Sequence, residues 1–307
     1  MSRHSVVAAI ATYRRPAELA RLLRSLDQVL TGLHGVVLVD NAAQDETIGV
    51  VEASALPIHR LALGRNLGCG GGLALAEKTA FQVFPEFTHL WVLDDDTVVT
   101  PNTLDILLDA MERERADAAH PLVVARDGFL GWFPGLLEAD KFRAIRQRQT
   151  PEEFIARCGA DPIRFSWSQG IALLVARRAF EELRFHRDDY WVRGEDLEFS
   201  LRITHRYRGI YVPGARVQHL PPSAANNAPE ISEYTKHRAM LQNLAYTALR
   251  LPHGRPLVRT LPGNWRRFIR TWGCRPHVAI DAASTLVQGA ILGKPAGAGR
   301  LPLAALA

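Results

Sequence analysis

The chain contains little cysteine and no long hydrophobic run. Only three of its 307 residues are cysteines, and they form neither a CxxC pair nor an even-numbered set. This pattern excludes a disulfide framework and predicts reduced thiols in a cytoplasmic protein. No apolar stretch reaches the roughly 18 residues of a membrane span. The apolar run near Met1 is also too short for a signal peptide, because Arg14 and Arg15 interrupt it.

Acidic residues are outnumbered by basic ones. The sequence has 37 lysines and arginines against 32 acids, a net charge of +5 and a pI of about 9.4. A basic surface suits an anionic ligand, an anionic membrane face or a nucleic acid, although an arginine-rich solvated surface explains it equally well. Because zinc-finger spacing and aromatic-rich RNA motifs are lacking, we expect no nucleic-acid partner.

Apolar strand-like runs alternate with helical patterns in the first half of the chain. The strand-like runs lie at 5–11, 35–39, 58–63 and 89–93, and the helical patterns at 16–30, 45–51, 72–84 and 103–115. Such alternation predicts an α/β fold, in which helices flank a mostly parallel central sheet.

The second half of the chain is less regular. A strand is expected at 171–175, a helix at 195–206, two short strands at 209–212 and 215–218, a loop at 221–229 and a helix at 231–250. Residues 293–307 have the composition of a loose tail. We therefore expect one domain over 1–228, with halves of about 1–120 and 121–228, and a C-terminal helical region over 229–307.

Polar residues follow each of the first four expected strands. They are Thr12-Tyr13-Arg14, Asp40-Asn41, Arg65-Asn66 and Asp94-Asp95-Asp96. Ligands of open α/β sheets bind at the carboxyl ends of the strands, so these groups are expected to share one pocket.

Three adjacent carboxylates, Asp94-Asp95-Asp96, give the strongest local signal. Such carboxylates repel one another unless a cation or hydrogen-bond donors offset them. Mg²⁺ and Mn²⁺ favour carboxylate oxygens together with phosphate oxygens. Because alternate residues of an extended chain point to one side, Asp94 and Asp96 are the expected ligands. The alternative is an acidic turn that caps the following helix.

Two further segments carry chemistry. The glycine-rich stretch 64–72 precedes a helix, where backbone N–H groups attract anions, although it matches neither a dinucleotide fingerprint nor a Walker loop. The pair Glu195-Asp196 begins another helix, and a carboxylate there suits a general base or merely complements the helix dipole. Tyr190 and Trp191, just upstream, suit stacking on a sugar. His219 stands alone after a strand, where a structural role is the commoner one.

Taken together and in order, these motifs resemble family 2 glycosyltransferases of the Rossmann-like GT-A fold, and among them the branch of rhamnosyltransferases and galactofuranosyltransferases. The resemblance covers roughly residues 5–250. It rests on the strand ends, the glycine stretch, Gly170, the acid pair followed by Leu197-Glu198-Phe199, and His219.

The resemblance implies a donor site for a UDP- or dTDP-linked sugar. Thr12, Arg14 and Asp40 would hold the nucleotide, with Asp40 at the pyrimidine base. Asn66 and Gly68 would lie along the ribose and diphosphate.

The resemblance also implies a divalent cation, Mn²⁺ or Mg²⁺. Asp94 and Asp96 would bind it, and His219 would complete the shell. Asp94 and Asp95 would also contact the donor, with Asp95 beside the ribose or sugar.

On the acceptor side, the resemblance makes Asp196 the catalytic base. Glu195, Trp167 and Trp191 would line the site of a saccharide, lipid-linked or small-molecule acceptor. Attack from the face opposite the diphosphate would invert the anomeric configuration, so no carboxylate nucleophile is needed.

Two other functions remain as alternatives: a nucleotidyltransferase and a non-catalytic nucleotide-sugar-binding module. The nucleotidyltransferase predicts a glycine-rich basic signature near the N-terminus, which the sequence lacks, and the binding module has no need of Asp196. The arginine- and tryptophan-containing segment after about Trp265 suits either a helical cap or peripheral contact with the inner face of the membrane.

Overall fold

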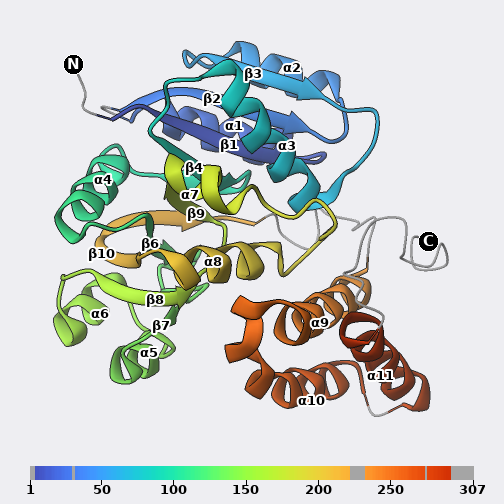
Figure 1. Cartoon of the computed structure of the whole chain (residues 1–307). Helices are drawn as coiled ribbons and strands as arrows, with labels where there is room; N and C mark the ends of the chain where they lie inside the picture. Colours follow the sequence, from blue (N-terminus) through green and yellow to red (C-terminus); the bar gives the residue numbers. More distant parts are fainter. Residues whose placement is uncertain (1–3, 30–31, 222–231, 274, 292–307) are drawn as a thin grey trace.

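The N-terminal half alternates strands and helices, as its pattern predicts. In the computed structural model, which describes residues 4–29, 32–221, 232–273 and 275–291, the elements follow in chain order (Figure 1). They are β1 Val6–Thr12, α1 Pro16–Leu26, β2 Leu33–Asp40, α2 Asp45–Glu52, β3 Ile58–Ala62, α3 Gly68–Val83, β4 His89–Asp94, β5 Thr97–Val99 and α4 Thr103–Glu114.

The second half adds strands to the same sheet and ends in helices. Its elements are β6 Ala118–Val124, β7 Gly135–Leu136, α5 Ala139–Ile145, α6 Pro151–Cys158, β8 Ile163–Trp167, β9 Ala172–Ala176, α7 Arg177–Leu183, α8 Glu195–Arg206, β10 Gly209–His219, α9 Glu233–Arg250, the 3₁₀ helix η2 Pro252–Thr260, α10 Leu261–Trp272 and α11 Pro276–Ala290. The expected α/β fold is thereby confirmed.

The sheet is mixed, with order β3-β2-β1-β4-β9-β6-β10-β8-β7 and β5 paired to β10. The first four strands in this order are parallel, whereas β9 runs antiparallel to both β4 and β6. The chain leaves β1 toward β2 on one side and returns to β4 on the other. The register pairs Thr12 with Asp40 and Ala11 with Asp94, so the polar strand ends meet at one edge.

Both faces of the sheet are covered, which explains the continuous apolar strands. Alternate residues of β1 point to opposite faces: Ile10 enters a core with α1 and α4, and Val7 enters a core with α3 and α7. Since neither face meets water, β1 does not alternate between apolar and polar residues. Every residue from Val6 to Ile10 is fully buried.

Helix α3 begins earlier than the sequence pattern predicts, at Gly68 rather than Gly72. The glycines form the first turn of α3, at positions where neighbouring residues leave no room for a side chain. A Cβ on Gly70 would lie 2.2 Å from the carbonyl oxygen of Tyr190, and one on Gly72 would lie 2.8 Å from Ala11 Cβ. Gly68 has φ +74°, a conformation that glycine adopts without strain.

Two other expectations need correction. The two short strands before His219 form the single strand β10, whose pairing with β6 is irregular between Val212 and Arg216. Helix α1 ends at Leu26 rather than residue 30. Apart from residue 221, the expected loop at 221–229 lies outside the described residues, and so does the tail at 293–307.

The C-terminal helices gather at one corner of the molecule, shown in orange to red in Figure 1. Helices α9, α10 and α11 share a small core formed by Leu241, Phe268, Val278 and Ala282. Within the described part of the chain, no helix is long and apolar enough to cross a membrane. The expected boundary near residue 228 stays a prediction.

Candidate active site

The three aspartates occupy the turn between β4 and β5, and a distant strand brings a histidine to them. Because β5 pairs antiparallel with β10, Thr97 faces His219 in the ladder. The Nε2 atom of His219 lies 2.7 Å from Asp96 Oδ1 and 3.8 Å from Asp94 Oδ2. Trp132 meets the imidazole edge-on, with ring centroids 4.3 Å apart. A histidine 123 positions further along the chain thus joins the acids.

Asp95 points to a different set of partners. Its carboxylate accepts a 2.7 Å hydrogen bond from the Thr12 hydroxyl and a 3.1 Å hydrogen bond from the Arg15 guanidinium. Arg15 also donates to Asp96 at 3.1 Å. The sequence analysis selected Arg14, whose guanidinium lies 5.3 Å from the Tyr13 ring centre. Arg15 was therefore missed, although it is the next residue, because sequence alone does not say which arginine turns inward.

Burial and mutual repulsion shift the protonation of these acids. Burial, then the charge of Asp96, raises the pKa of Asp94 to about 7. Burial raises the pKa of Asp95 to about 6, although Arg15 opposes the rise. The pKa of Asp96 is lowered instead: burial would raise it, but the contact with His219 and the charge of Arg15 together outweigh burial. The pKa of His219 is raised, because Asp96, Asp94 and Asp95 together outweigh the lowering effect of burial.

Asp94, Asp96 and His219 fit a divalent cation. One ligand atom from each of the three residues can be chosen so that all lie within 4.8 Å of one another. Two carboxylates and one imidazole form a donor set of the kind that Mn²⁺ binds. About a third of the Asp94 side chain is exposed, so the cluster is open on one side. The predicted ligands thus come together.

The predicted nucleotide residues form the framework beside this cluster. Asp40 is fully buried, and Arg60 donates to its Oδ2 at 2.6 Å while the N–H groups of Ala42 and Ala43 donate to its Oδ1. Both carboxylate oxygens of Asp40 thus accept hydrogen bonds from within the protein, and no sequence motif pointed to Arg60 as its partner.

The residues before α3 hold one another in place. Asn41 accepts a hydrogen bond from the N–H of Leu67, and Asn66 accepts one from the N–H of Gly68. The Asn66 side chain therefore fixes the start of α3. A direct contact of Asn66 or Gly68 with a ribose stays a prediction.

The second acid pair opens α8. Gly194 has φ +94° and precedes the helix, and Asp196 Oδ1 accepts a 2.7 Å hydrogen bond from the N–H of Leu197. Gly170 lies so close that an added Cβ would be 3.4 Å from Asp196 Cβ. Burial raises the pKa of Asp196, and the charge of Asp196 in turn raises the pKa of Asp94. The two clusters are therefore near enough for their charges to interact.

Glu195 and Cys69 form a contact between α8 and the start of α3. Burial, then the charge of Asp196, raises the pKa of Glu195 to about 7, and the hydrogen bond of the Cys69 thiol opposes this rise. Burial likewise raises the pKa of Cys69 well above its usual value. The thiol is thus a neutral donor to an acid. No sequence motif predicts this contact between Cys69 and Glu195.

The aromatic residues assigned to the acceptor differ in their exposure. Tyr190 is fully buried, and its hydroxyl shares a 2.7 Å hydrogen bond with Thr247, so its predicted stacking on a sugar is wrong. Trp191 is 7% exposed and its ring covers Gly68. Trp167 lies against Gly135 and the C-terminal helices and is partly exposed. The assignment of both tryptophans to the acceptor stays a prediction.

A buried pair lies behind the acids. His186 Nδ1 lies 2.6 Å from Glu77 Oε1, and the His186 N–H donates to Glu77 Oε2 at 2.8 Å. Both side chains are buried, and the His186 ring lies 3.9 Å from that of Phe199 on α8. The pair therefore connects α3 to the segment that leads to Glu195 and Asp196.

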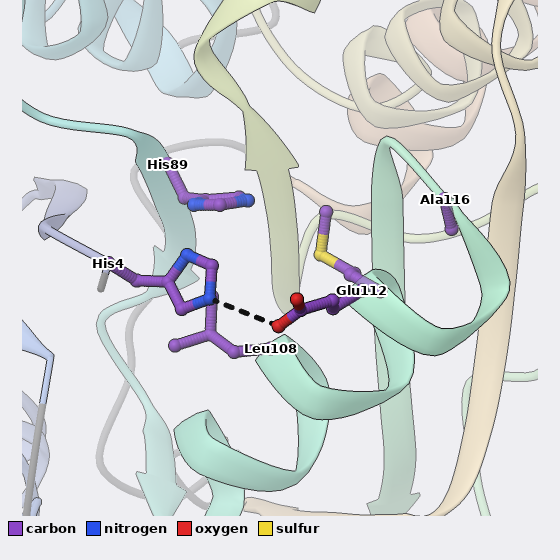
Figure 2. A pocket seen from close by; sticks show the side chains of 6 residues that line it. His4, His89, Leu108, Glu112 and Ala116 are labelled. Atoms are coloured by element: carbon purple, nitrogen blue, oxygen red, sulfur yellow. Dashed lines mark ion pairs between the residues drawn. The ribbon is translucent and has the colours of Figure 1, made fainter. Parts of the chain in front are cut away.

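A cavity elsewhere, of about 210 Å³, carries none of these groups. Figure 2 shows His4, His89 and Glu112 around it, with His4 Nε2 3.9 Å from a Glu112 oxygen. Burial, then the neighbouring His4, lowers the pKa of His89 to about 4. His89 begins β4 and Asp94 ends it, so this cavity is at the opposite edge of the sheet.

An open acidic cluster thus lies at the switch point of the sheet, near the pair formed by the buried Glu195 and the half-buried Asp196. Residues 7–171, more than half of the chain, match the family described as Glycosyl transferase family 2. The chain therefore belongs to glycosyl transferase family 2 and is a glycosyltransferase.

Among its relatives is N-acetylglucosaminyl-diphospho-decaprenol L-rhamnosyltransferase of Mycobacterium tuberculosis. The two are 26% identical over 287 residues, which cover 88% of this chain and 89% of the relative.

Solved structures share the fold at lower identity. TarS 1–349 of S. aureus superposes with a TM-score of 0.60 and 15% identity, over 94% of this chain and 81% of that one. GalNAc-T7 with UDP, GalNAc and Mn²⁺ gives a TM-score of 0.58 and 17% identity, over 92% of this chain and 58% of that one. The expected GT-A fold is thereby confirmed.

Proposed function

We propose that this enzyme transfers a sugar from a UDP- or dTDP-linked donor to an acceptor hydroxyl, with inversion and with the help of Mn²⁺ or Mg²⁺. The observation that carries the proposal is the grouping of Asp94, Asp96 and His219 near the half-buried Asp196, whose charge raises the pKa of Asp94. Asp94, Asp96 and His219 suit the binding of a cation and, through it, of the diphosphate. Asp196 suits the uptake of a proton. GalNAc-T7 was solved with UDP and Mn²⁺, and TarS with UDP-GlcNAc, which supports the donor class.

The donor would lie between the first turn of α3 and the aspartates. Thr12 and Arg15 orient Asp95, which then faces the ribose or the donor sugar. Asp40 and Arg60 form the wall at the base, with Arg14 nearby at the mouth. Asn66 and Gly68 shape the backbone along the diphosphate, where the helix N-terminus favours negative charge.

Asp94, Asp96 and His219 would hold the cation, which when bound neutralises the charge that develops on the leaving diphosphate. Asp196 accepts the proton of the acceptor hydroxyl. The acceptor oxygen then forms a bond to the anomeric carbon while the bond to the diphosphate oxygen breaks. One displacement inverts the configuration, and the proton leaves on Asp196.

The acceptor site would surround Asp196. Among the described residues, several buried polar atoms there lack a hydrogen-bond partner: Ser168 Oγ, Gln169 Oε1, Trp191 Nε1 and Glu195 Oε2. Unpaired buried polar atoms are rare, and a sugar hydroxyl would satisfy them. Glu195, Trp167 and Trp191 are accordingly proposed to line this site.

A lipid-linked saccharide is the acceptor class we favour over a free saccharide or a small molecule. The mycobacterial relative is named for an acceptor on diphospho-decaprenol. Such an acceptor would bring the enzyme to the inner face of a membrane by peripheral contact. We also propose that the catalytic domain ends near residue 228 and that the helical region after it serves this contact.

A screen of nucleotide sugars tests the donor assignment. Thermal shift is measured with UDP- and dTDP-sugars, each with Mn²⁺ and with a chelator, and with purine nucleotide sugars as controls. We expect stabilisation only by pyrimidine donors and only with the cation. NMR of the product then gives the anomeric configuration, and retention would rule out the single displacement.

A further inference from the structure

The segment that covers η2, α10 and the start of α11 has an unusual charge balance. Residues 251–280 contain six arginines and no aspartate or glutamate. All six side chains are exposed: Arg255, Arg259, Arg266, Arg267, Arg270 and Arg275. An exposed cationic surface of this density attracts polyanions.

Some exposed arginines elsewhere, such as Arg24 and Arg115, form no ion pair among the described residues. Others, such as Arg143, Arg206 and Arg216, are each paired with an acid on the same or a neighbouring element. None of the six arginines of 251–280 makes an ion pair within the described residues, and what distinguishes them is that they follow one another along a segment without any acid. Their charges are therefore available to a partner.

Helix α11, which packs on α10, adds an apolar stripe. Ile280 is 67% exposed, Val287 45% and Ile291 67%. Their spacing of seven and four residues places them on one face, opposite Val278 and Ala282, which are buried on the neighbouring helices. The only acidic or basic residue of α11 apart from His277 is Asp281. Its Oδ2 atom accepts a hydrogen bond from the Tyr234 hydroxyl and lies 3.7 Å from Arg238 Nε. The outer face is therefore uncharged.

We propose that the C-terminal helices dock on an anionic lipid bilayer. The arginines of 251–280 contact lipid phosphates, and Ile280, Val287 and Ile291 enter the boundary between headgroups and acyl chains. Charge complementarity favours the bilayer, and the apolar stripe distinguishes it from a nucleic acid, which offers no apolar layer. This inference rests on the proposed peripheral membrane contact and names the surface that makes it.

Sedimentation with vesicles tests the surface. Full-length enzyme is mixed with phosphatidylcholine vesicles that contain or lack phosphatidylglycerol. We expect binding only to the anionic vesicles, with weakening at high salt. The Arg266→Gln, Arg267→Gln, Arg270→Gln variant should bind about 100-fold more weakly, since each basic residue near an anionic surface contributes roughly a 5-fold gain.

A second variant separates the apolar contribution. Ile280→Ser, Val287→Ser, Ile291→Ser should lose about tenfold or more in binding at every salt concentration. The matched control is Ile48→Ser, Val83→Ser, Leu137→Ser, which removes side chains of 39–53% exposure elsewhere. Circular dichroism confirms that each variant is folded.

Other outcomes would overturn the proposal. These are equal binding of wild type and both variants, equal binding to neutral vesicles, or a dimer in solution that the serine variant abolishes. Tight oligonucleotide binding that is insensitive to the serine changes would favour a nucleic acid instead. Asp196→Asn should bind vesicles like wild type, so a loss of catalysis and a loss of docking are told apart.

Discussion

The two acid clusters at the carboxyl edge of the sheet have opposite surroundings. Asp95 and Asp96 lie beside basic side chains: Arg15 contacts both of them, and His219 contacts Asp96. Glu195 and Asp196 instead have a thiol and backbone N–H groups as donors. In the first cluster the nearby cations lower the pKa of Asp96, although burial still raises those of Asp94 and Asp95. In the second cluster the pKa values of both acids are raised.

This difference separates two kinds of chemistry. A group that must hold a cation needs a stable negative charge, whereas a group that must take up a proton works best when its pKa lies near the working pH. The lowered pKa of Asp96 and the raised pKa values of Glu195 and Asp196 follow that division. Asp94 departs from it when no cation is bound, because burial and the charge of Asp96 raise its pKa to about 7.

The largest expected effect comes from Asp196→Asn. An amide cannot accept the proton of the acceptor hydroxyl, so kcat should fall by about 10²–10⁴-fold. Donor affinity, measured by calorimetry, should stay within about twofold, because the change leaves the proposed cation site intact. Asp188→Asn is the control, since Asp188 is an exposed acid nearby. Turnover near the wild-type level would mean that a group other than Asp196 accepts the proton.

The next effect concerns the cation cluster. Asp96→Ala should abolish the Mn²⁺-dependent part of donor binding, a loss of about 100-fold or more if the cation supplies several kcal/mol. The measurement is calorimetric titration of UDP and dTDP with and without Mn²⁺. Asp109→Ala, an exposed acid on α4, serves as the control. Unchanged Mn²⁺ dependence would move the cation away from Asp96.

The activity should also depend on pH through the second cluster. Burial and the charge of Asp196 raise the pKa of Glu195 to about 7, and burial also raises the pKa of Asp196, so the pair takes up protons at a higher pH than ordinary carboxyl groups do. Because the base must be ionised, kcat/KM should fall about tenfold per unit on the acid side. Stopped assays from pH 5 to 9 at saturating Mn²⁺ measure it. A flat profile down to pH 5 would place the base among acids of ordinary pKa.

Much of this comparison was visible in the sequence. Apolar runs that end in polar residues predicted the strand edge, and Asp94, Asp96 and His219 came together as expected. The partners of the charges were not visible. Arg15 and Arg60 are two of many arginines, and only the packed backbone selects them. Long-range pairing, such as that of β5 with β10, has no local signature.

The start of α3 was predicted wrongly for a related reason. Glycines usually indicate a turn, so the sequence predicted that α3 begins after them. In the structure Gly70 and Gly72 lie in the first turn of α3, where Tyr190 and Ala11 approach too closely for a side chain. The glycines there answer to contacts from elsewhere in the chain rather than to a turn, and those contacts have no local signature in the sequence.

The smallest expected effect comes from Asp94→Asn, which tests the repulsion among the buried carboxylates of the first cluster. The folded-state pKa of Asp94, about 7, lies above its ordinary value of 3.8. Stability that comes from the protonated form is therefore present below 3.8 and is lost as the pH rises through about 7. At pH 8 without divalent cations, the asparagine variant should be more stable than wild type. We expect a gain of about 1 kcal/mol, because a third of the side chain is exposed and solvent screens its charge. At pH 4 the two should unfold alike.

Adding Mn²⁺ at pH 8 should raise the Tm of wild type more than that of the variant, since the cation offsets the repulsion that the substitution has removed. A variant less stable than wild type at pH 8 in chelator would mean that Asp94 is held by favourable contacts, and the contrast between the clusters would then rest on Asp96 and His219 alone.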